Sequence, residues 1–248
     1  MMVENISYRE SHKREGKGKD YDAHYSEMPH RRFLWEREQL VLSNILKTYF
    51  KGHEIHLLDF ACGTGRITSF LESKVTTSVG VDVSDAMLEE ARKKLPNTKL
   101  IKADILRDNI LTGRKFNLIT AFRFFLNAEP ELRHAALRAL VPLLEKDGCF
   151  VFNNHRNINS PLIRLQSRQK KGNLNYMTIK NMHDLVNSVG LEIVRIYPIG
   201  LLQIFRSKMP INLKHIIENI TTKFPFLRNY SESPIAVCQF SSYHTRNR

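Results

Sequence analysis

Three aspartates stand at the ends of short apolar runs in the first half of the chain. Asp59 belongs to IHLLDF, Asp82 to SVGVDV and Asp104 to KLIKADI. A carboxylate at Asp82 can accept hydrogen bonds from two ribose hydroxyls, and one at Asp104 can accept from an adenine amino group. Asp59 would attract an ammonium or sulfonium charge. A single aspartate is more typical of a helix cap or a turn, but three in this order indicate a nucleoside site with a cationic neighbour.

A glycine-containing turn, Ala61-Cys62-Gly63-Thr64-Gly65, directly follows the first of these runs. Glycine has no Cβ, so backbone and ligand can approach closely there, although glycine in such a turn can also serve the turn alone. Gly65 precedes Arg66-Ile67 rather than Lys-Ser/Thr, which argues against a nucleoside-triphosphate loop. The spacing also fits a dinucleotide fingerprint poorly, and Asp59 would repel a pyrophosphate. A nicotinamide oxidoreductase is therefore the weaker alternative.

Strands and helices alternate around these motifs. Apolar runs predict five strands, at 55–60, 78–83, 99–105, 116–122 and 149–154. Helical spacing predicts helices at 33–50, 67–74, 84–95 and 129–148. After a polar, basic stretch, the sequence predicts a helix at 178–190, a strand at 191–200, a basic amphipathic segment at 211–224 and a last strand at 235–242. The pattern predicts an α/β, Rossmann-like doubly wound sheet, mostly parallel, with ligands at the carboxyl ends of its strands.

The segments LLDFACGTGRIT, VGVDVSDAMLEEARKK, KLIKADI and FNLITAFRFFLN resemble, in order and spacing, the successive motifs of class I S-adenosylmethionine-dependent methyltransferases. The resemblance covers residues 33–155 strongly and 176–242 weakly. It implies S-adenosyl-L-methionine as cofactor and a seven-stranded sheet whose last strand is antiparallel. Ala61 departs from the family pattern, which more usually has glycine there; we expect this exchange of one small residue for another to be tolerated.

The resemblance also implies which residues hold the cofactor. Asp59 and the 61–65 turn would bind its methionine part, Asp82 the ribose and Asp104 the adenine. Residues before the first strand would fold over the methionine end, although a solvated helix position is the alternative for Arg37 and is slightly favoured. The expected cofactor-binding residues are Tyr25, Arg37, Asp59, Ala61, Cys62, Gly63, Gly65, Asp82, Val83, Met87, Asp104, Ile105 and Phe122.

The methyl acceptor is expected beside the segments that follow the fourth and fifth strands. His155 could deprotonate a hydroxyl there near neutral pH, although a histidine bonded to a loop carbonyl is the more common arrangement. The expected substrate-binding residues are Arg123, Phe124, Asn127 and Asn154, with one of Phe124 and Phe125 expected in the core. Their mixture of aromatic, amide and cationic groups suits a polar small molecule, sugar-like or anionic. Neither a base-amino signature nor a Pro-Cys nucleophile occurs, and no Cys/His cluster has metal-ligand spacing.

Charge is distributed unevenly along the 248 residues. The net charge is +13, and residues 156–248 contribute fourteen Lys/Arg against four Asp/Glu. The alternative function is therefore a methyltransferase-like binding module that docks on RNA or an acidic surface through this basic third. We expect residues 1–20 to be a mobile tail and 21–248 to form one domain, with a cofactor-binding core at 21–155 and a basic closing segment at 156–248. Three widely spaced cysteines and the lack of an apolar span or leader favour a cytoplasmic protein.

Overall fold

A seven-stranded sheet forms the centre of the protein in the computed structural model, which describes residues 28–169, 175–201 and 209–241. The strand order is β3-β2-β1-β4-β5-β7-β6; β1 to β5 are parallel, and β7 is antiparallel to both β5 and β6. The predicted fold class is thus confirmed. The strands are β1 (His56–Phe60), β2 (Thr77–Asp82), β3 (Lys99–Lys102), β4 (Phe116–Ala121), β5 (Leu144–Asn153), β6 (Leu191–Tyr197) and β7 (Ile235–Phe240).

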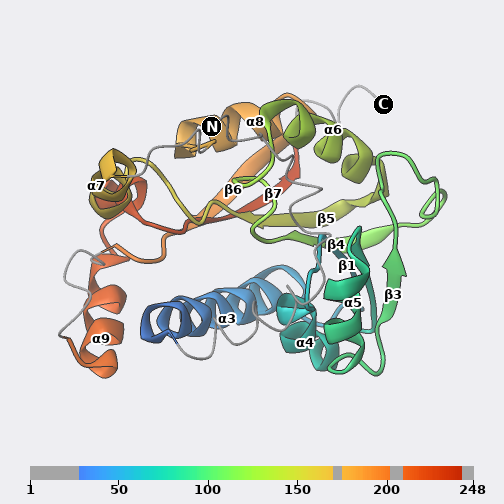
Figure 1. Cartoon of the computed structure of the whole chain (residues 1–248), viewed down its shortest axis with the longest axis horizontal. Helices are drawn as coiled ribbons and strands as arrows, with labels where there is room; N and C mark the ends of the chain where they lie inside the picture. Colours follow the sequence, from blue (N-terminus) through green and yellow to red (C-terminus); the bar gives the residue numbers. More distant parts are fainter. Residues whose placement is uncertain (1–27, 170–174, 202–208, 242–248) are drawn as a thin grey trace, which may run out of the picture.

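Helices cover both faces of the sheet (Figure 1). One face carries α3 (Pro29–Tyr49), α4 (Arg66–Leu71) and α5 (Asp85–Arg92), and the other carries α6 (Pro130–Leu140) and α8 (Ile179–Asn187). Side chains alternate between the two cores along each strand: Leu57 packs with α3 and α4, whereas Leu58 packs with α6 and α8. This two-sided burial explains why the central strands are continuous apolar runs.

The predicted helix at 129–148 is wrong in its second half. α6 ends at Leu140, a 3₁₀ helix spans Val141–Leu143, and β5 already begins at Leu144, five residues before the predicted strand start. Pro142 explains the early end, because proline has no N–H to donate to the preceding helical turn. Partner residues on β4 and β5 jump from Phe116↔Leu144 to Leu118↔Cys149, so an irregularity in the pairing accommodates the additional residues of β5.

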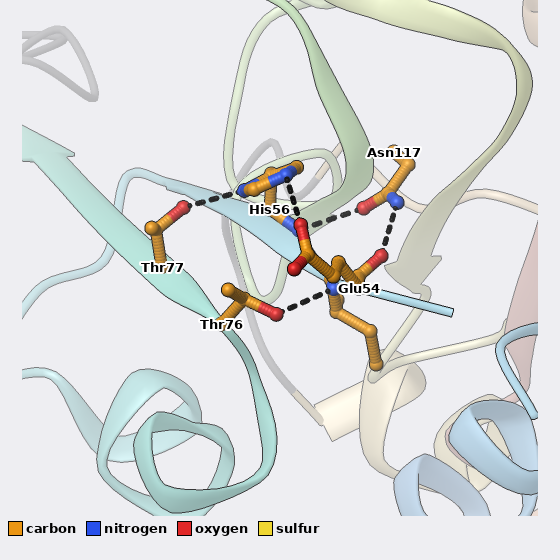
Figure 2. Close-up of polar contacts among 6 residues, drawn as sticks. Glu54, His56, Thr76, Thr77 and Asn117 are labelled. Atoms are coloured by element: carbon orange, nitrogen blue, oxygen red, sulfur yellow. Dashed lines mark hydrogen bonds and ion pairs between the residues drawn. The ribbon is translucent and has the colours of Figure 1, made fainter. Parts of the chain in front are cut away.

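Polar contacts fix β1 between its neighbours at the amino edge of the sheet (Figure 2). Asn117 of β4 accepts the His56 N–H at 2.8 Å and donates to the Glu54 carbonyl at 2.7 Å. On the other side, Thr76 accepts the Ile55 N–H at 3.1 Å, and the His56 ring lies 2.9 Å from the Thr77 hydroxyl. These contacts pair backbone groups that the sheet leaves open, so they hold the register that aligns the opposite, carboxyl ends of the strands.

The basic C-terminal third completes the sheet and adds two helices at one end of the molecule (Figure 1), α7 (Pro161–Gln169) and α9 (Ile211–Thr221). α7 was not predicted and lies within the polar stretch. Residues 1–20, expected to be a tail, lie outside the described residues, and the division of the domain at residue 155 stays a prediction. Within the described ranges, we find no helix with the length and hydropathy needed to traverse a bilayer.

Candidate functional site

A pocket opens at the carboxyl ends of the β1, β2 and β3 strands. It brings together five of the predicted cofactor-binding residues, namely Ala61, Asp82, Val83, Asp104 and Ile105. The remaining lining residues are Phe60, Val81, Ala103, Leu106, Phe124 and Leu132. Two carboxylates among mostly apolar walls suit a flat apolar group that carries hydroxyl and amino donors.

Asp82 joins the glycine turn to the end of β2. Its carboxylate accepts the Gly63 N–H at 2.8 Å and the Ser84 N–H at 2.9 Å. Ser84 in turn caps α5 by accepting the Met87 N–H. Asp82 therefore lines the pocket from a position fixed by two backbone donors, while Met87 lies 2% exposed behind it.

The turn itself has a left-handed backbone at three positions. The φ angles are 53° at Ala61, 56° at Gly63 and 76° at Gly65. A Cβ on Gly65 would lie 2.5 Å from Cδ1 of Leu95, so this glycine is also required for close packing. Ala61 is the exception, because an L-residue in this conformation costs about 1 kcal/mol. Cys62 is buried between these positions, and burial raises the pKa of its thiol well above the ordinary value, which keeps the thiol protonated.

Asp59 does not line the pocket, although the sequence suggested that it faces the cationic part of the ligand. It is 1% exposed and accepts hydrogen bonds from the hydroxyls of Thr68, at 2.5 Å, and Thr120, at 2.7 Å. Burial raises the pKa of Asp59 to about 6, against the opposing effect of the two hydroxyls. In this structure Asp59 therefore fastens α4 and β4 to the end of β1 from below the turn.

Asp104 shapes the far side of the pocket. Its carboxylate accepts the Leu106 N–H at 3.2 Å and lies 3.6 Å from Nε of Arg107. Its own N–H donates to Asp108 at 2.8 Å. These short-range contacts hold the segment after β3 as a turn, with Ile105 against the pocket.

The segment after β4 is held by two asparagines. Arg123 has a φ of 63°, and its N–H donates to Oδ1 of Asn153 at 2.7 Å. Asn127 donates to the Arg123 carbonyl at 2.6 Å, so its amide fixes the loop. Phe124 lines the cofactor-side pocket and packs edge-on against Phe60, with ring centroids 4.7 Å apart. The structure thus places Phe124 with the predicted cofactor residues and not apart from them.

A buried carboxylate that the sequence analysis missed lies beside this loop. Glu38 of α3 is 1% exposed, pairs with Arg66 at 2.6 Å and accepts from Nδ2 of Asn153 at 3.3 Å. Arg66 also lies over the ring of Trp35 at 4.4 Å. We call Glu38, Arg66, Asn153 and Arg123 the Glu38 network. A signal was present, because Glu38 lies four residues from both Leu34 and Leu42 on the apolar face of its helix.

One predicted residue that precedes β1, Arg37, is not brought to the turn. Arg37, one position before Glu38, points toward α9 and donates to Oδ1 of Asn219 at 2.6 Å. About 100° of helical rotation separates neighbouring residues, so Arg37 and Glu38 cannot face the same site. Tyr25 lies outside the described residues.

His155 lies at the carboxyl end of β5 and is 6% exposed. Its Nδ1 has no hydrogen-bond partner among the described residues. Burial lowers the pKa of His155 well below its ordinary value, and four arginines lower it further. We call this group, which consists of His155, Arg31, Arg66, Arg123 and Arg156, the arginine–histidine cluster. The imidazole is therefore neutral at pH 7 and has four arginines near it, of which Arg66 is paired with Glu38.

The remaining predicted residues are structural neighbours of the site. Asn154 is fully buried and donates to the Met177 carbonyl at 2.8 Å, so its amide supports the chain behind the cluster. Phe122 is 7% exposed and packs in the core shared by α3 and α4. Neither residue lines the pocket that Asp82 and Asp104 share.

Comparisons with known proteins agree with this geometry. Residues 57–148 match the family model described as a methyltransferase domain. A malonyl-[acyl-carrier protein] O-methyltransferase of Priestia megaterium is 31% identical over 123 residues, which cover 47% of this chain and 42% of that protein. A dTDP-3-amino-3,4,6-trideoxy-alpha-D-glucopyranose N,N-dimethyltransferase of Streptomyces venezuelae is 32% identical over 139 residues, which cover 55% and 51%. The chain spans about half the length of the curated relatives it matches.

Solved structures extend the likeness to nearly the whole fold. The magnesium protoporphyrin IX methyltransferase of Synechocystis PCC 6803, solved with SAH bound, superimposes with a TM-score of 0.61 at 14% identity, over 91% of this chain and 95% of that one. Identity this low shows the fold alone. The sequence match thus assigns a methyltransferase domain to residues 57–148, and the fold of the chain is that of the solved methyltransferase.

Proposed function

We propose that the chain is an S-adenosylmethionine-dependent methyltransferase that acts on a polar, anionic small molecule. The observation that carries the proposal is the pocket shared by Asp82 and Asp104 within a methyltransferase domain. Its two carboxylates lie at the ends of neighbouring strands, and its walls are apolar.

The residues present fit the cofactor. Asp82 would accept the ribose hydroxyls, Asp104 would accept the adenine amino group, and Ile105 and Phe124 would flank the base. S-adenosylmethionine supplies, when bound, an electrophilic methyl group on a sulfonium sulfur. The protein then contributes alignment of the acceptor with that methyl group, which is the main protein contribution to such displacements.

The arginine–histidine cluster supports an anionic acceptor. Arg31, Arg66, Arg123 and Arg156 all act on the charge state of His155. An acceptor carboxylate or phosphate bound there would offset this positive charge. Two of the relatives are named for malonyl-[acyl-carrier protein] and for a dTDP-amino sugar, whose malonyl and dTDP parts carry a carboxylate and phosphates. The neutral imidazole of His155 would accept the proton of a hydroxyl acceptor, and a bound anion would make that imidazole more basic.

Calorimetry tests the cofactor assignment. We expect S-adenosylhomocysteine to bind saturably, and NADH and a short RNA not to bind. Asp82→Asn should weaken that binding about tenfold or more, because charged hydrogen bonds to the ribose are lost. Asp85→Asn is the matched control, since Asp85 lies three residues away and pairs with Lys102 on the surface. Binding of RNA alone, with steep salt dependence, would instead support the docking module.

A methyl-transfer screen tests the acceptor side. Nucleotide sugars, phenols and carboxylates are incubated with cofactor, and turnover is compared for the native protein, His155→Gln and His134→Gln. His134 is an exposed histidine on α6 and serves as control. We expect His155→Gln to slow transfer to a hydroxyl about a hundredfold. Unchanged turnover would remove His155 from the proposed chemistry and leave the cofactor assignment standing.

A further inference from the structure

Helix α9 attaches to the rest of the protein through polar side chains. His215 contacts Glu36 of α3 at 2.8 Å, and Asn219 accepts from Arg37. Glu218 is 2% exposed and accepts the N–H groups of Gly200 and Leu201. The face of α9 that touches the protein thus combines these polar groups with Ile211, which packs against the core under α3.

The opposite face of α9 is apolar and exposed. Leu213, Ile216 and Ile220 are 43%, 56% and 53% exposed. They occupy positions i, i+3 and i+7 of the helix, which form one stripe. The exposed apolar surface continues beyond the helix with Phe224 and Phe226, whose rings lie 5.8 Å apart. We call these five residues the α9 stripe.

Helix α8 shows the ordinary arrangement for comparison. It has nearly the same length, and its apolar residues Ile179, Met182, Leu185 and Val186 are all buried. α9 therefore exposes to solvent the kind of surface that α8 packs against the sheet. A contiguous exposed apolar stripe of this kind marks an interaction surface.

Cationic side chains accompany the stripe. Lys214, Lys223 and Arg228 lie on or directly after α9, while the acidic residue of the helix, Glu218, is turned inward. α7 lies at the same end of the molecule (Figure 1) and carries exposed Leu165 with Arg164 and Arg168. The described charged side chains on α7 and on or directly after α9 are thus mainly cationic.

We propose that α9 lies on an anionic membrane surface, with the α9 stripe in the boundary between headgroups and acyl chains. This goes beyond the proposed methyl transfer. Burial of the stripe removes apolar area from water, and the lysines and the arginine meet anionic headgroups, as in other interfacial amphipathic helices. The positive charge matches such a surface, whereas a nucleic acid would leave Leu213, Ile216 and Ile220 in water.

Vesicle sedimentation with the full chain tests the proposal. Vesicles of phosphatidylcholine and phosphatidylglycerol in equal parts are compared with pure phosphatidylcholine. We expect binding to the anionic vesicles that weakens with salt, and at least about tenfold weaker binding of Ile216→Ser/Ile220→Ser. Lys214→Glu/Lys223→Glu should weaken binding to anionic vesicles by a similar factor. Ile110→Ser is the matched control, since Ile110 is 43% exposed and lies between β3 and β4.

Several outcomes would overturn the proposal. It is wrong if the native protein does not bind anionic vesicles, or if the stripe variant binds as well as Ile110→Ser. Size-exclusion chromatography tests one alternative, namely that a second copy of the chain covers the stripe. This alternative is supported if the native protein is a dimer, does not bind vesicles, and becomes a monomer in Ile216→Ser/Ile220→Ser. The other alternative is a nucleic acid partner. RNA binding that depends on the lysines but not on the stripe would support it and overturn the membrane proposal. Unchanged thermal midpoints of the variants show that a loss of binding is not a loss of folding.

Discussion

The two halves of the carboxyl edge of the sheet are assembled in different ways. Around the pocket beside β1, β2 and β3, many polar contacts join partners that are near in sequence: Asp82 contacts Ser84, Asp104 contacts Leu106, and Asp59 contacts Thr68. Two contacts there are longer in sequence, since Asp82 also accepts from Gly63 and Asp59 from Thr120. Beside β4 and β5, Glu38 contacts a residue 28 positions later and another 115 positions later. The first half is built mainly from strand-to-helix turns, and the second from segments that meet only in the complete fold.

The two halves are therefore expected to differ in how much they vary between related proteins. A pocket made of local turns forms wherever the motifs occur, which suits a part that binds the same cofactor in many proteins. A cluster assembled from distant segments changes whenever one segment changes. The arginine–histidine cluster, where we place the acceptor, is therefore the part expected to differ most between relatives.

Removal of Glu38 should have the largest effect on stability. Glu38→Ala leaves Arg66 without its buried partner, and we expect a loss of about 3 kcal/mol in the free energy of unfolding. Urea unfolding followed by the fluorescence of Trp35, the single tryptophan, measures it. The exposed Lys180–Asp184 pair on α8 is the control, and its removal should cost less than about 1 kcal/mol. Equal losses for both pairs would mean that the Glu38 network contributes no more to stability than an exposed ion pair.

The pH dependence of stability tests the buried end of β1. Because burial raises the pKa of Asp59 to about 6, the native state binds a proton more tightly than the unfolded chain. This contribution is complete below the unfolded pKa and is lost as the pH rises through about 6. Relative to Asp59→Asn, the native protein should lose about 2 kcal/mol between pH 4 and pH 7. Parallel pH profiles of the two proteins, measured by urea unfolding, would refute the assignment.

Two glycines in one turn separate packing from backbone strain. Gly63 and Gly65 both have positive φ, but only Gly65 has a neighbour that a Cβ would strike. We expect Gly65→Ala to lower the free energy of unfolding by about 2–3 kcal/mol and Gly63→Ala by about 1 kcal/mol. Thermal unfolding of the pair measures the difference. If Gly63→Ala lowered the free energy of unfolding more than Gly65→Ala, the close contact with Leu95 would not be the reason for glycine at position 65.

The smallest effect should come from the departure at Ala61. Glycine tolerates the left-handed conformation at this position, so Ala61→Gly should raise the free energy of unfolding by about 0.5 kcal/mol after the entropic cost of glycine. Ala136→Gly, in the middle of α6, should instead lower it by about 1 kcal/mol. Two losses of similar size would mean that the backbone at Ala61 is not strained.

In the local half of the site, the sequence predicted which residues lie together, while their role toward a cofactor stays a prediction. Asp82, Val83, Asp104 and Ile105 line one pocket, because each follows a parallel strand and the carboxyl ends of neighbouring strands meet. The strand alternation predicted a mostly parallel, doubly wound sheet, and the family resemblance implied its seven strands. The main error in the predicted elements, the helix at 129–148, came from extending an apolar helical pattern past Pro142.

The long-range half was not predictable in the same way. Which face of α3 turns toward the sheet is decided by the packing of Phe33, Leu34 and Ile45, and this places Glu38 in the site and Arg37 outside it. The exposed face of α9 was equally hidden, since an apolar helical stripe ordinarily predicts burial. The two threonine partners of Asp59 lie on separate elements, so the sequence did not reveal them. Asp59 was therefore predicted to face the ligand.

The position of Asn153 at the very end of β5 has a consequence for synthesis of the chain. α3 leaves the ribosome before the sheet, but one of the groups that contacts its buried carboxylate does not emerge until more than a hundred residues later. The strand that closes its apolar face, β7, follows later still. During translation Glu38 therefore stays hydrated at first. α3 can pack in its native position only after the rest of the sheet has been synthesised.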